Sequence, residues 1–142
     1  MNNFINALRN YAGFSGRTSR KEFWSFILFN TIFSIAAAIL DNVLGLTTKV
    51  DFGYGPQQLP YGYIYFAYSI FMTIPVLAIT VRRLHDIGKS AWYWLIALIP
   101  FLGVLWLVAL FCKKGDAGDN KYGVDPEYTD GARLFINTSD NI

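Results

Sequence analysis

Hydrophobic and charged residues lie in separate blocks along this chain. Three stretches, 23–40, 62–81 and 91–112, contain no Asp, Glu, Lys, Arg or His. Each has close to the ~17–25 residues that a helix needs to cross the hydrocarbon core of a bilayer. The pattern predicts an all-α integral membrane protein, built as one domain over residues 1–142 with three apolar helical segments.

The start of the first helix is marked by a capping motif. Ser19 and Glu22 form an S-x-x-E box directly before an apolar run, which predicts a helix beginning near Arg20. Upstream, Phe4, Leu8 and Tyr11 are spaced to share one helical face. We therefore expect a short interfacial helix within the basic N-terminal region, 1–22, followed by helix one over 23–40.

The remaining segments follow from glycine, proline and charge. Glycines and prolines predict a loop over 41–61, helix two covers 62–81, and a basic loop follows over 82–90. The third apolar segment, 91–112, contains Pro100 near its midpoint. It is predicted to be either one kinked span or a re-entrant hairpin around this proline, and residues 113–142 form a polar tail.

Composition agrees with a membrane protein and excludes several other classes. Only 15% of the residues are charged, against about 25% in soluble domains. A net charge of +2 is too small to indicate nucleic acid as a partner. Cys112 is the single cysteine, which excludes an intramolecular disulfide and a cysteine-pair metal site. We expect neither a metal nor a cofactor.

The distribution of cations predicts the orientation in the membrane. Four cations precede helix one, namely Arg9, Arg17, Arg20 and Lys21, and three occupy the 82–90 loop, whereas the 41–61 loop has only Lys49. The positive-inside rule then places the N-terminus and the 82–90 loop in the cytoplasm. The side of the tail stays open, because a third full span would export it and a re-entrant hairpin would return it.

The cations near the second helix end also suggest a binding site. Arg82, Arg83, His85 and Lys89 converge at one interface, where charge-assisted hydrogen bonds could hold a lipid phosphate or a soluble anion. The predicted anion-binding set is Arg17, Arg20, Lys21, Arg82, Arg83, His85, Lys89 and Ser90. The alternative is an electrostatic anchor in which Asp86 pairs with one of the arginines.

A second set of residues suggests helix packing. Asn30, Ser34 and Ala38 are spaced along one face of helix one, and small or hydrogen-bonding residues at this spacing are typical of helix–helix contacts in lipid. They predict packing against a neighbouring helix, and the alternative is a solvated functional pocket around Asn30.

No catalytic motif accompanies these residues. His85 is the only histidine, and no nucleophile or metal ligand is spaced to act with it. We therefore interpret the chain as a non-enzymatic membrane module whose cytoplasmic basic surface binds anionic lipid headgroups or a partner protein. An oligomeric channel or small-solute transporter is the alternative. A lipid-modifying enzyme that uses His85 and Asp86 is a third hypothesis.

Three motifs carry a resemblance to a known family. They are RTSRKEFW at 17–24, RRLHDIGKSAW at 82–92, and the Gly, Asp and Asn pattern at 115–126 that ends in Asp125-Pro126. In this order and spacing they resemble the YhaH/YhaI-like bacterial inner-membrane proteins, which share a domain of unknown function numbered 805. The resemblance implies a small protein of the bacterial cytoplasmic membrane and implies no established activity.

Overall fold

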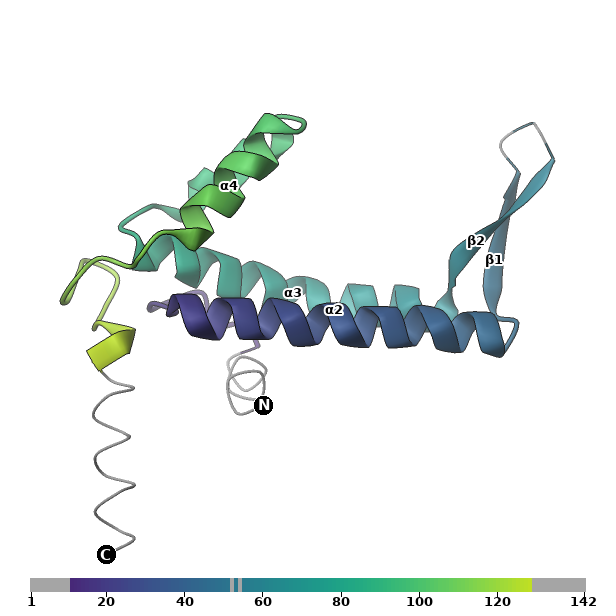
Figure 1. The fold of residues 1–142 in the computed structure, drawn as a ribbon, viewed down its shortest axis with the longest axis horizontal. Helices are drawn as coiled ribbons and strands as arrows, with labels where there is room; N and C mark the ends of the chain where they lie inside the picture. Colours follow the sequence, from purple (N-terminus) through teal and green to yellow (C-terminus); the bar gives the residue numbers. More distant parts are fainter. Residues whose placement is uncertain (1–10, 52, 54, 129–142) are drawn as a thin grey trace, which may run out of the picture.

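The structure is a computed structural model that describes residues 11–51, 53 and 55–128. In chain order the elements are α2 (Arg20–Val43), β1 (Thr47–Asp51), β2 (Pro56–Gly62), α3 (Tyr63–Asp86), the 3-10 helix η1 (Ala91–Leu98) and α4 (Leu102–Cys112). α2 and α3 lie side by side and antiparallel, with the strands projecting at one end and η1 and α4 at the other (Figure 1). The predicted interfacial helix falls mainly on residues 1–10, outside the described residues.

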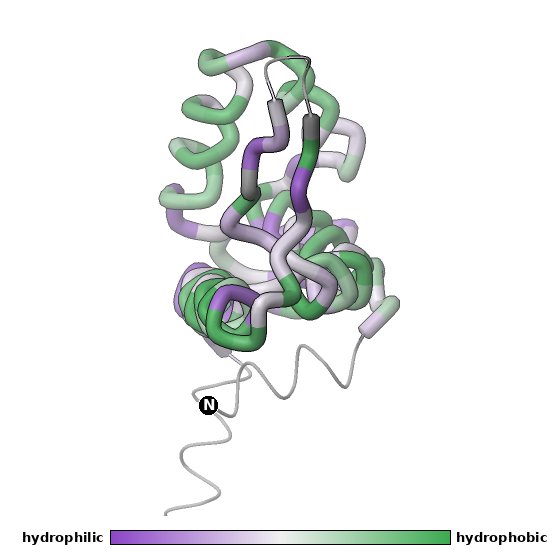
Figure 2. Tube along the Cα trace, turned by 90° about the vertical axis from the view of Figure 1, so that its right-hand side faces the viewer, coloured by the Kyte–Doolittle hydropathy of each residue, from purple (hydrophilic) through white to green (hydrophobic). Residues whose placement is uncertain are grey.

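The two long helices present their apolar side chains outward. Each has 24 residues and is long and apolar enough to cross a membrane. Only 17% of the most apolar part of α2, and 28% of that of α3, is buried inside the structure. The core helix of a soluble protein would instead be mostly buried. Figure 2 shows hydrophobic residues along both helices and more hydrophilic positions in the strands.

α2 begins as the capping box predicts. The Ser19 side chain accepts a hydrogen bond from the Glu22 backbone N–H at 3.2 Å. The helix is longer than the apolar run 23–40 at both ends, because Arg20 to Glu22 form its first turn and Asp41 to Val43 its last. Residues 41–43 therefore do not belong to a loop.

The prediction of a loop over 41–61, and with it an all-α fold, is wrong. β1 and β2 form a two-stranded antiparallel sheet with Lys49 opposite Gln58. Thr47, Thr48 and Val50 are β-branched residues that favour strands. Gly53 and Gly55 supply positive φ angles of 88° and 95° at the turn. The glycines and prolines mark only the turn and the edges of this hairpin, so the fold is mostly helical rather than all-α.

α3 extends five residues beyond the apolar stretch. Residues 82–86, predicted as part of a basic loop, are the last turn of the helix. The helix ends where Gly88 takes a φ of 68°. Its N–H donates to the His85 carbonyl at 3.1 Å, and the Lys89 N–H donates to the Leu84 carbonyl at 2.9 Å. This is a Schellman ending, which glycine favours.

The third apolar segment is a hairpin, one of its two predicted forms. η1 and α4 are separated at Ile99 to Phe101 and pack against each other. Phe101 has a φ of 61°, the only positive φ at a non-glycine among the described residues. A Cβ on Gly103 would collide with the Ile96 carbonyl, so glycine permits the close approach of the two arms. Because the chain folds back, both ends of the hairpin lie at the same end of the molecule (Figure 1).

The hydrophobic core is small and lies mainly where the helices meet near this end. Phe23 and Phe26 of α2, Ile79 and Leu84 of α3, and Phe111 of α4 are all buried in one cluster. The rings of Phe23 and Phe111 are 4.8 Å apart. This cluster fixes the positions of the polar side chains just beyond it.

Candidate functional site: the basic end

Three chain segments meet beyond the core at one end of the molecule. They are residues 16–22, residues 82–90 and residues 112–125, which we call the basic end. The Thr18 N–H donates to the Arg82 carbonyl at 3.2 Å, and the Asp116 N–H donates to the Asp86 carbonyl at 2.8 Å. The N-terminal segment and the tail are therefore both attached to the end of α3.

A buried cluster of three charged side chains lies at the centre of the basic end. Arg17 Nε donates to Asp86 Oδ1 at 3.0 Å, and Arg83 Nη1 pairs with Asp86 Oδ2. The side chains of Arg17, Asp86 and Arg83 are 1%, 4% and 0% exposed. Removing one member of a buried ion pair leaves an uncompensated charge. Asp86 thus neutralises two arginines that come from different segments.

The same two arginines also bind the tail through its backbone. Arg17 Nη2 donates to the Asp116 carbonyl at 2.6 Å and Nη1 to the Gly118 carbonyl at 2.5 Å. Arg83 Nη2 donates to the carbonyls of Phe111, at 3.1 Å, and Lys113. The guanidinium groups therefore use most of their donors on contacts that hold the fold together.

Gly115 gives the tail room to pass the buried carboxylate. A Cβ at this position would lie 2.7 Å from Asp86 Cγ, which is closer than real Cβ contacts allow. Gly115 therefore has a steric role, because its missing side chain leaves space for the Asp86 carboxylate.

His85 makes its contacts with the tail and the N-terminal segment. Its ring stacks on that of Tyr122, with centroids 3.9 Å apart and planes 3° from parallel. Its Nδ1 lies 3.2 Å from the Gly16 carbonyl oxygen. Asn120 Nδ2 donates to the His85 carbonyl at 2.9 Å. The imidazole therefore lies between the N-terminal segment and the tail, where both meet the end of α3.

Asp125 contributes a carboxylate beside the tail contacts. Desolvation raises its pKa, but the net pKa is lowered, because the backbone N–H groups of Glu127 and Gly118 and the positive charges of Arg17 and Lys114 together stabilise the ionised form. The Gly118 N–H donates to Asp125 Oδ2 at 2.9 Å. The Asp125 carboxylate therefore joins two parts of the tail through hydrogen bonds to backbone N–H groups.

Arg82 differs from its neighbours. It is 7% exposed, and its Nε and Nη2 atoms have no hydrogen-bond partner. The Thr18 hydroxyl is also buried without a partner. Buried donors are normally satisfied in native proteins.

The other predicted site residues lie nearer the surface. Arg20 is exposed and donates to the Cys112 carbonyl at 3.3 Å, and Lys21 is exposed in the first turn of α2. Lys89 Nζ lies 5.1 Å from the centroid of the Tyr93 ring. Ser90 is the N-cap residue of η1 and makes no side-chain cap bond.

The eight predicted anion-binding residues therefore share one end but differ in environment. Arg17 and Arg83 are buried in the cluster, Arg82 is buried with unpaired donors, and the lysines and Arg20 are at or near the surface. Sequence reasoning considered Asp86 as a partner of an arginine or as a catalytic group beside His85. It did not single out Thr18, Asn120 or Tyr122 as site residues. The Gly, Asp and Asn motif of the tail was the signal that could have pointed to them.

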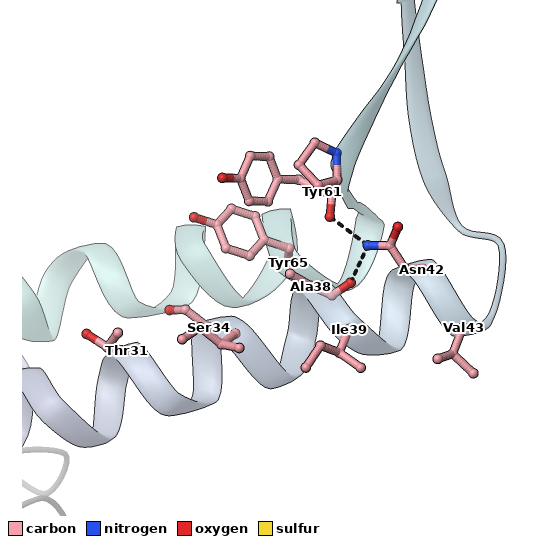
Figure 3. Close-up of a pocket in the computed structure, with 10 residues that line it drawn as sticks. Thr31, Ser34, Ala38, Ile39, Asn42, Val43, Tyr61 and Tyr65 are labelled. Atoms are coloured by element: carbon pink, nitrogen blue, oxygen red, sulfur yellow. Dashed lines mark hydrogen bonds between the residues drawn. The ribbon is translucent and has the colours of Figure 1, made fainter.

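The predicted packing residues lie along the groove between the long helices. Asn30 Oδ1 accepts a hydrogen bond from the Tyr68 hydroxyl at 2.9 Å, which joins α2 to α3. Ser34 donates to the carbonyl of Asn30 in its own helix. The Ala38 carbonyl accepts from Asn42 Nδ2, which also donates to the Pro60 carbonyl (Figure 3).

Two grooves border these contacts. One of about 470 Å³ lies beside Ser34, Ala38 and Tyr65 near the strands (Figure 3). The other, about 360 Å³, lies beside Asn30, Tyr68 and Ser34. Within the described part of the chain, no group of three or more His, Cys, Asp or Glu side chains is placed to hold a metal.

Two long outward-facing apolar helices, a helical hairpin and a polar junction at one end define a small, mostly helical membrane protein. The chain belongs to the family described as "Protein of unknown function (DUF805)", whose model matches residues 11–124. The predicted family resemblance is thus confirmed. The match ends close to the last residues of the basic end.

Two relatives from Escherichia coli strain K12 extend this result. The chain is 40% identical over 124 residues to inner membrane protein YhaH, covering 87% of this chain and 95% of YhaH. It is 38% identical over 125 residues to inner membrane protein YhaI, covering 88% and 95%. No solved structure matches the chain. These relatives support the membrane character that the hydrophobic pattern predicts.

Proposed function

We propose that this chain is a non-enzymatic membrane module whose basic end lies in the cytoplasm and binds anionic lipid headgroups. One observation carries the proposal. The η1–α4 hairpin folds back (Figure 1), and Arg20 and Arg83 donate to the carbonyls of Cys112 and Lys113. Lys113 and Lys114 therefore lie at the same end as Arg20, Lys21 and Lys89. Cations from three separate segments thereby face one side of the membrane.

The charge at the two ends of the long helices supports this orientation. The basic end contains nine cations and five carboxylates: Arg17, Arg20, Lys21, Arg82, Arg83, Lys89, Lys113, Lys114 and Lys121 against Glu22, Asp86, Asp116, Asp119 and Asp125. The segment around the strands, residues 41–62, has Lys49 against Asp41 and Asp51. An excess of Lys and Arg marks the cytoplasmic side. A tail reporter that proved periplasmic would contradict the orientation.

The exposed cations are the ones available to lipid. Arg17 and Arg83 are buried and bound to Asp86, whereas Arg20, Lys21, Lys113 and Lys114 are exposed. Each cation close to an anionic surface contributes about 1 kcal/mol of attraction. A few such side chains would give a clear preference for anionic over zwitterionic lipid.

The test uses the full chain reconstituted in nanodiscs of mixed phosphatidylglycerol and phosphatidylcholine. Native mass spectrometry would measure the phosphatidylglycerol that is retained by the wild type and by a triple variant, Arg20→Gln, Lys21→Gln and Lys114→Gln. We expect the triple variant to lose the enrichment. Lys49→Gln, at the opposite end, is the matched control and should keep it. Equal enrichment in the wild type and the triple variant would refute the proposal.

The grooves along α2 and α3 favour a second candidate, an oligomeric channel. Asn30, Ser34 and Tyr68 place amide and hydroxyl groups beside a groove of about 360 Å³ within the apolar region. A pore would need several copies to line such a path. This candidate predicts a stable homo-oligomer and solute flux in liposomes, both weakened by Asn30→Leu. A monomer without flux would exclude it.

A further inference from the structure

The unpaired donors of Arg82 form one edge of its guanidinium group. Nε and Nη2 lie side by side, and this edge binds two oxygens of a phosphate or carboxylate in the bidentate arrangement that arginine favours. Both atoms are buried and have no hydrogen-bond partner. The residue as a whole is 7% exposed. The structure therefore leaves a complete bidentate edge buried without an acceptor.

In the adjacent arginine, Arg83, the same two nitrogens have a hydrogen-bond acceptor. Arg83 Nε and Nη2 both donate to the Phe111 carbonyl, at 3.3 Å and 3.1 Å. Its remaining nitrogen pairs with Asp86. Two consecutive arginines at the end of one helix thus differ in the same two atoms, and only the edge of Arg82 is left without a protein acceptor.

Thr18, whose backbone contacts that of Arg82, has a second unpaired donor. Its N–H donates to the Arg82 carbonyl at 3.2 Å, which holds the backbones of the two residues together. Its hydroxyl is buried without a partner. Leaving a buried donor without an acceptor destabilises the fold. An acceptor with several oxygens would relieve this cost at both residues.

We propose that Arg82 and Thr18 form a binding site for a phosphate group, which is carried by a lipid headgroup or by free phosphate. Arg82 is the main contact because it offers two unpaired donors and a positive charge, and Thr18, with one neutral hydroxyl, is the secondary one. The site deepens the proposed function and rests on it for its position at a membrane surface. It separates Arg82, which binds the ligand, from Arg17 and Arg83, which hold the fold.

Glu22 tunes this site. Its carboxylate interacts electrostatically with Arg82, so it competes with an incoming anion for the guanidinium charge. The exposed cations Arg20 and Lys21 lie in the same turn of α2 and attract anions. Glu22→Gln should therefore strengthen phosphate binding. If Arg82 has only a structural role, the same substitution should leave phosphate binding unchanged.

The experiment compares variants that keep the charge but alter the donors. The full chain in detergent would be titrated with short-chain phosphatidylglycerol and, separately, with inorganic phosphate, and binding followed by native mass spectrometry. Arg82→Lys removes the bidentate edge and should weaken binding about tenfold, equivalent to about 1.4 kcal/mol. Thr18→Val removes only the hydroxyl and should weaken it less. Lys49→Gln, in β1 at the opposite end of the molecule, is the control and should bind like the wild type.

The two probes identify the source of the phosphate. Binding of phosphatidylglycerol that inorganic phosphate does not displace assigns the site to a lipid headgroup. Tight binding of inorganic phosphate assigns it to the free anion. Wild-type affinity for both probes in Arg82→Lys and in Thr18→Val would overturn the inference, and thermal unfolding of each variant would show that it is folded.

This result is distinguishable from failure of the proposed function. If the triple variant loses its phosphatidylglycerol enrichment while Arg82→Lys and Thr18→Val bind normally, lipid binding by the exposed cations is supported and the phosphate site is refuted. If Arg82→Lys loses binding while the triple variant keeps its enrichment, the phosphate site is supported and the exposed cations are not needed for lipid binding. If the wild type binds neither probe and shows no enrichment, both proposals fall.

Discussion

Each end of the long helices contains a buried aspartate, and the two are stabilised differently. Asp41, near the strands, accepts hydrogen bonds from the backbone N–H groups of Gly62, Ile64 and Tyr65, at 3.0, 3.0 and 2.9 Å. Asp86, at the basic end, is paired with the guanidinium groups of Arg17 and Arg83. One carboxylate is bound by neutral dipoles at a helix start, the other by full charges.

The difference lies in what each aspartate connects. Asp41 closes a hairpin and begins the next helix, so its partners lie 21 to 24 residues away. Asp86 joins α3 to a segment 69 residues earlier, and through Arg17 to carbonyls about 100 residues from that arginine. Neutral capping organises local structure, whereas the ion-paired aspartate organises the whole basic end.

The largest effect should follow from neutralising the basic end. Asp86→Asn leaves two buried arginines without a counter-charge, and breaking a buried pair costs about 3–5 kcal/mol. We expect a large drop in the thermal unfolding temperature in detergent and early proteolytic cleavage within residues 113–128. Glu127→Gln is the control, because its pairing with Lys114 is exposed. An unchanged unfolding temperature in Asp86→Asn would contradict this role.

Asp41→Asn should have a smaller and more local effect. The amide keeps one acceptor oxygen but turns an NH₂ group toward backbone donors, so at least one of the three hydrogen bonds is lost. We expect faster hydrogen exchange at the amides of residues 62–65, with the basic end unaffected. Exchange that accelerates equally at residues 113–125 would show that the two ends are coupled.

A steric variant sharpens the comparison at the basic end. Gly115→Ala places a methyl group against Asp86, and such overpacking costs about 1–3 kcal/mol. Gly118→Ala is the matched control, because a Cβ there meets no atom within 4 Å and only its φ of 74° is strained. The unfolding temperature should fall more for Gly115→Ala. The reverse order would show that the passage beside Asp86 is not tight.

The smallest effect concerns the aromatic stack. Tyr122→Leu keeps an apolar side chain but removes the ring that stacks on His85. Such pairs contribute about 0.5–1.5 kcal/mol beyond their buried area. The His85 imidazole signals in an NMR spectrum should shift while the fold is retained. Unperturbed signals would mean that the stack does not persist in solution.

Sequence reasoning was most successful where the structure depends on local signals. The Ser19 and Glu22 motif fixed the start of α2, the apolar runs located the long helices, and Pro100 marked the break in the third segment. The strands were missed because Gly53, Gly55 and the two prolines dominated the interpretation of the loop. A two-stranded hairpin needs few residues and leaves a weak periodic signal.

The candidate site was predictable as a set of residues but not as an arrangement. Charge alone grouped Arg17, Arg82 and Arg83 together, yet the structure gives them different environments. Which arginine meets Asp86 depends on contacts between distant segments. Arg17 and Arg83 also bind backbone carbonyls of the tail, and a carbonyl has no side-chain signature in a sequence.

The spacing of the Arg17 contacts has a consequence for biosynthesis. Its carbonyl partners in Asp116 and Gly118 lie 99 and 101 residues later in the chain. The hydrogen bonds from Arg17 to these two carbonyls therefore cannot form until the ribosome has made residue 118 and α4 has returned to the basic end. Until Asp86 has also been made, Arg17 carries a charge without its partner, and the positive-inside rule assigns such residues a part in directing insertion. The same guanidinium group would first guide the nascent chain into the membrane and afterwards stabilise the finished fold.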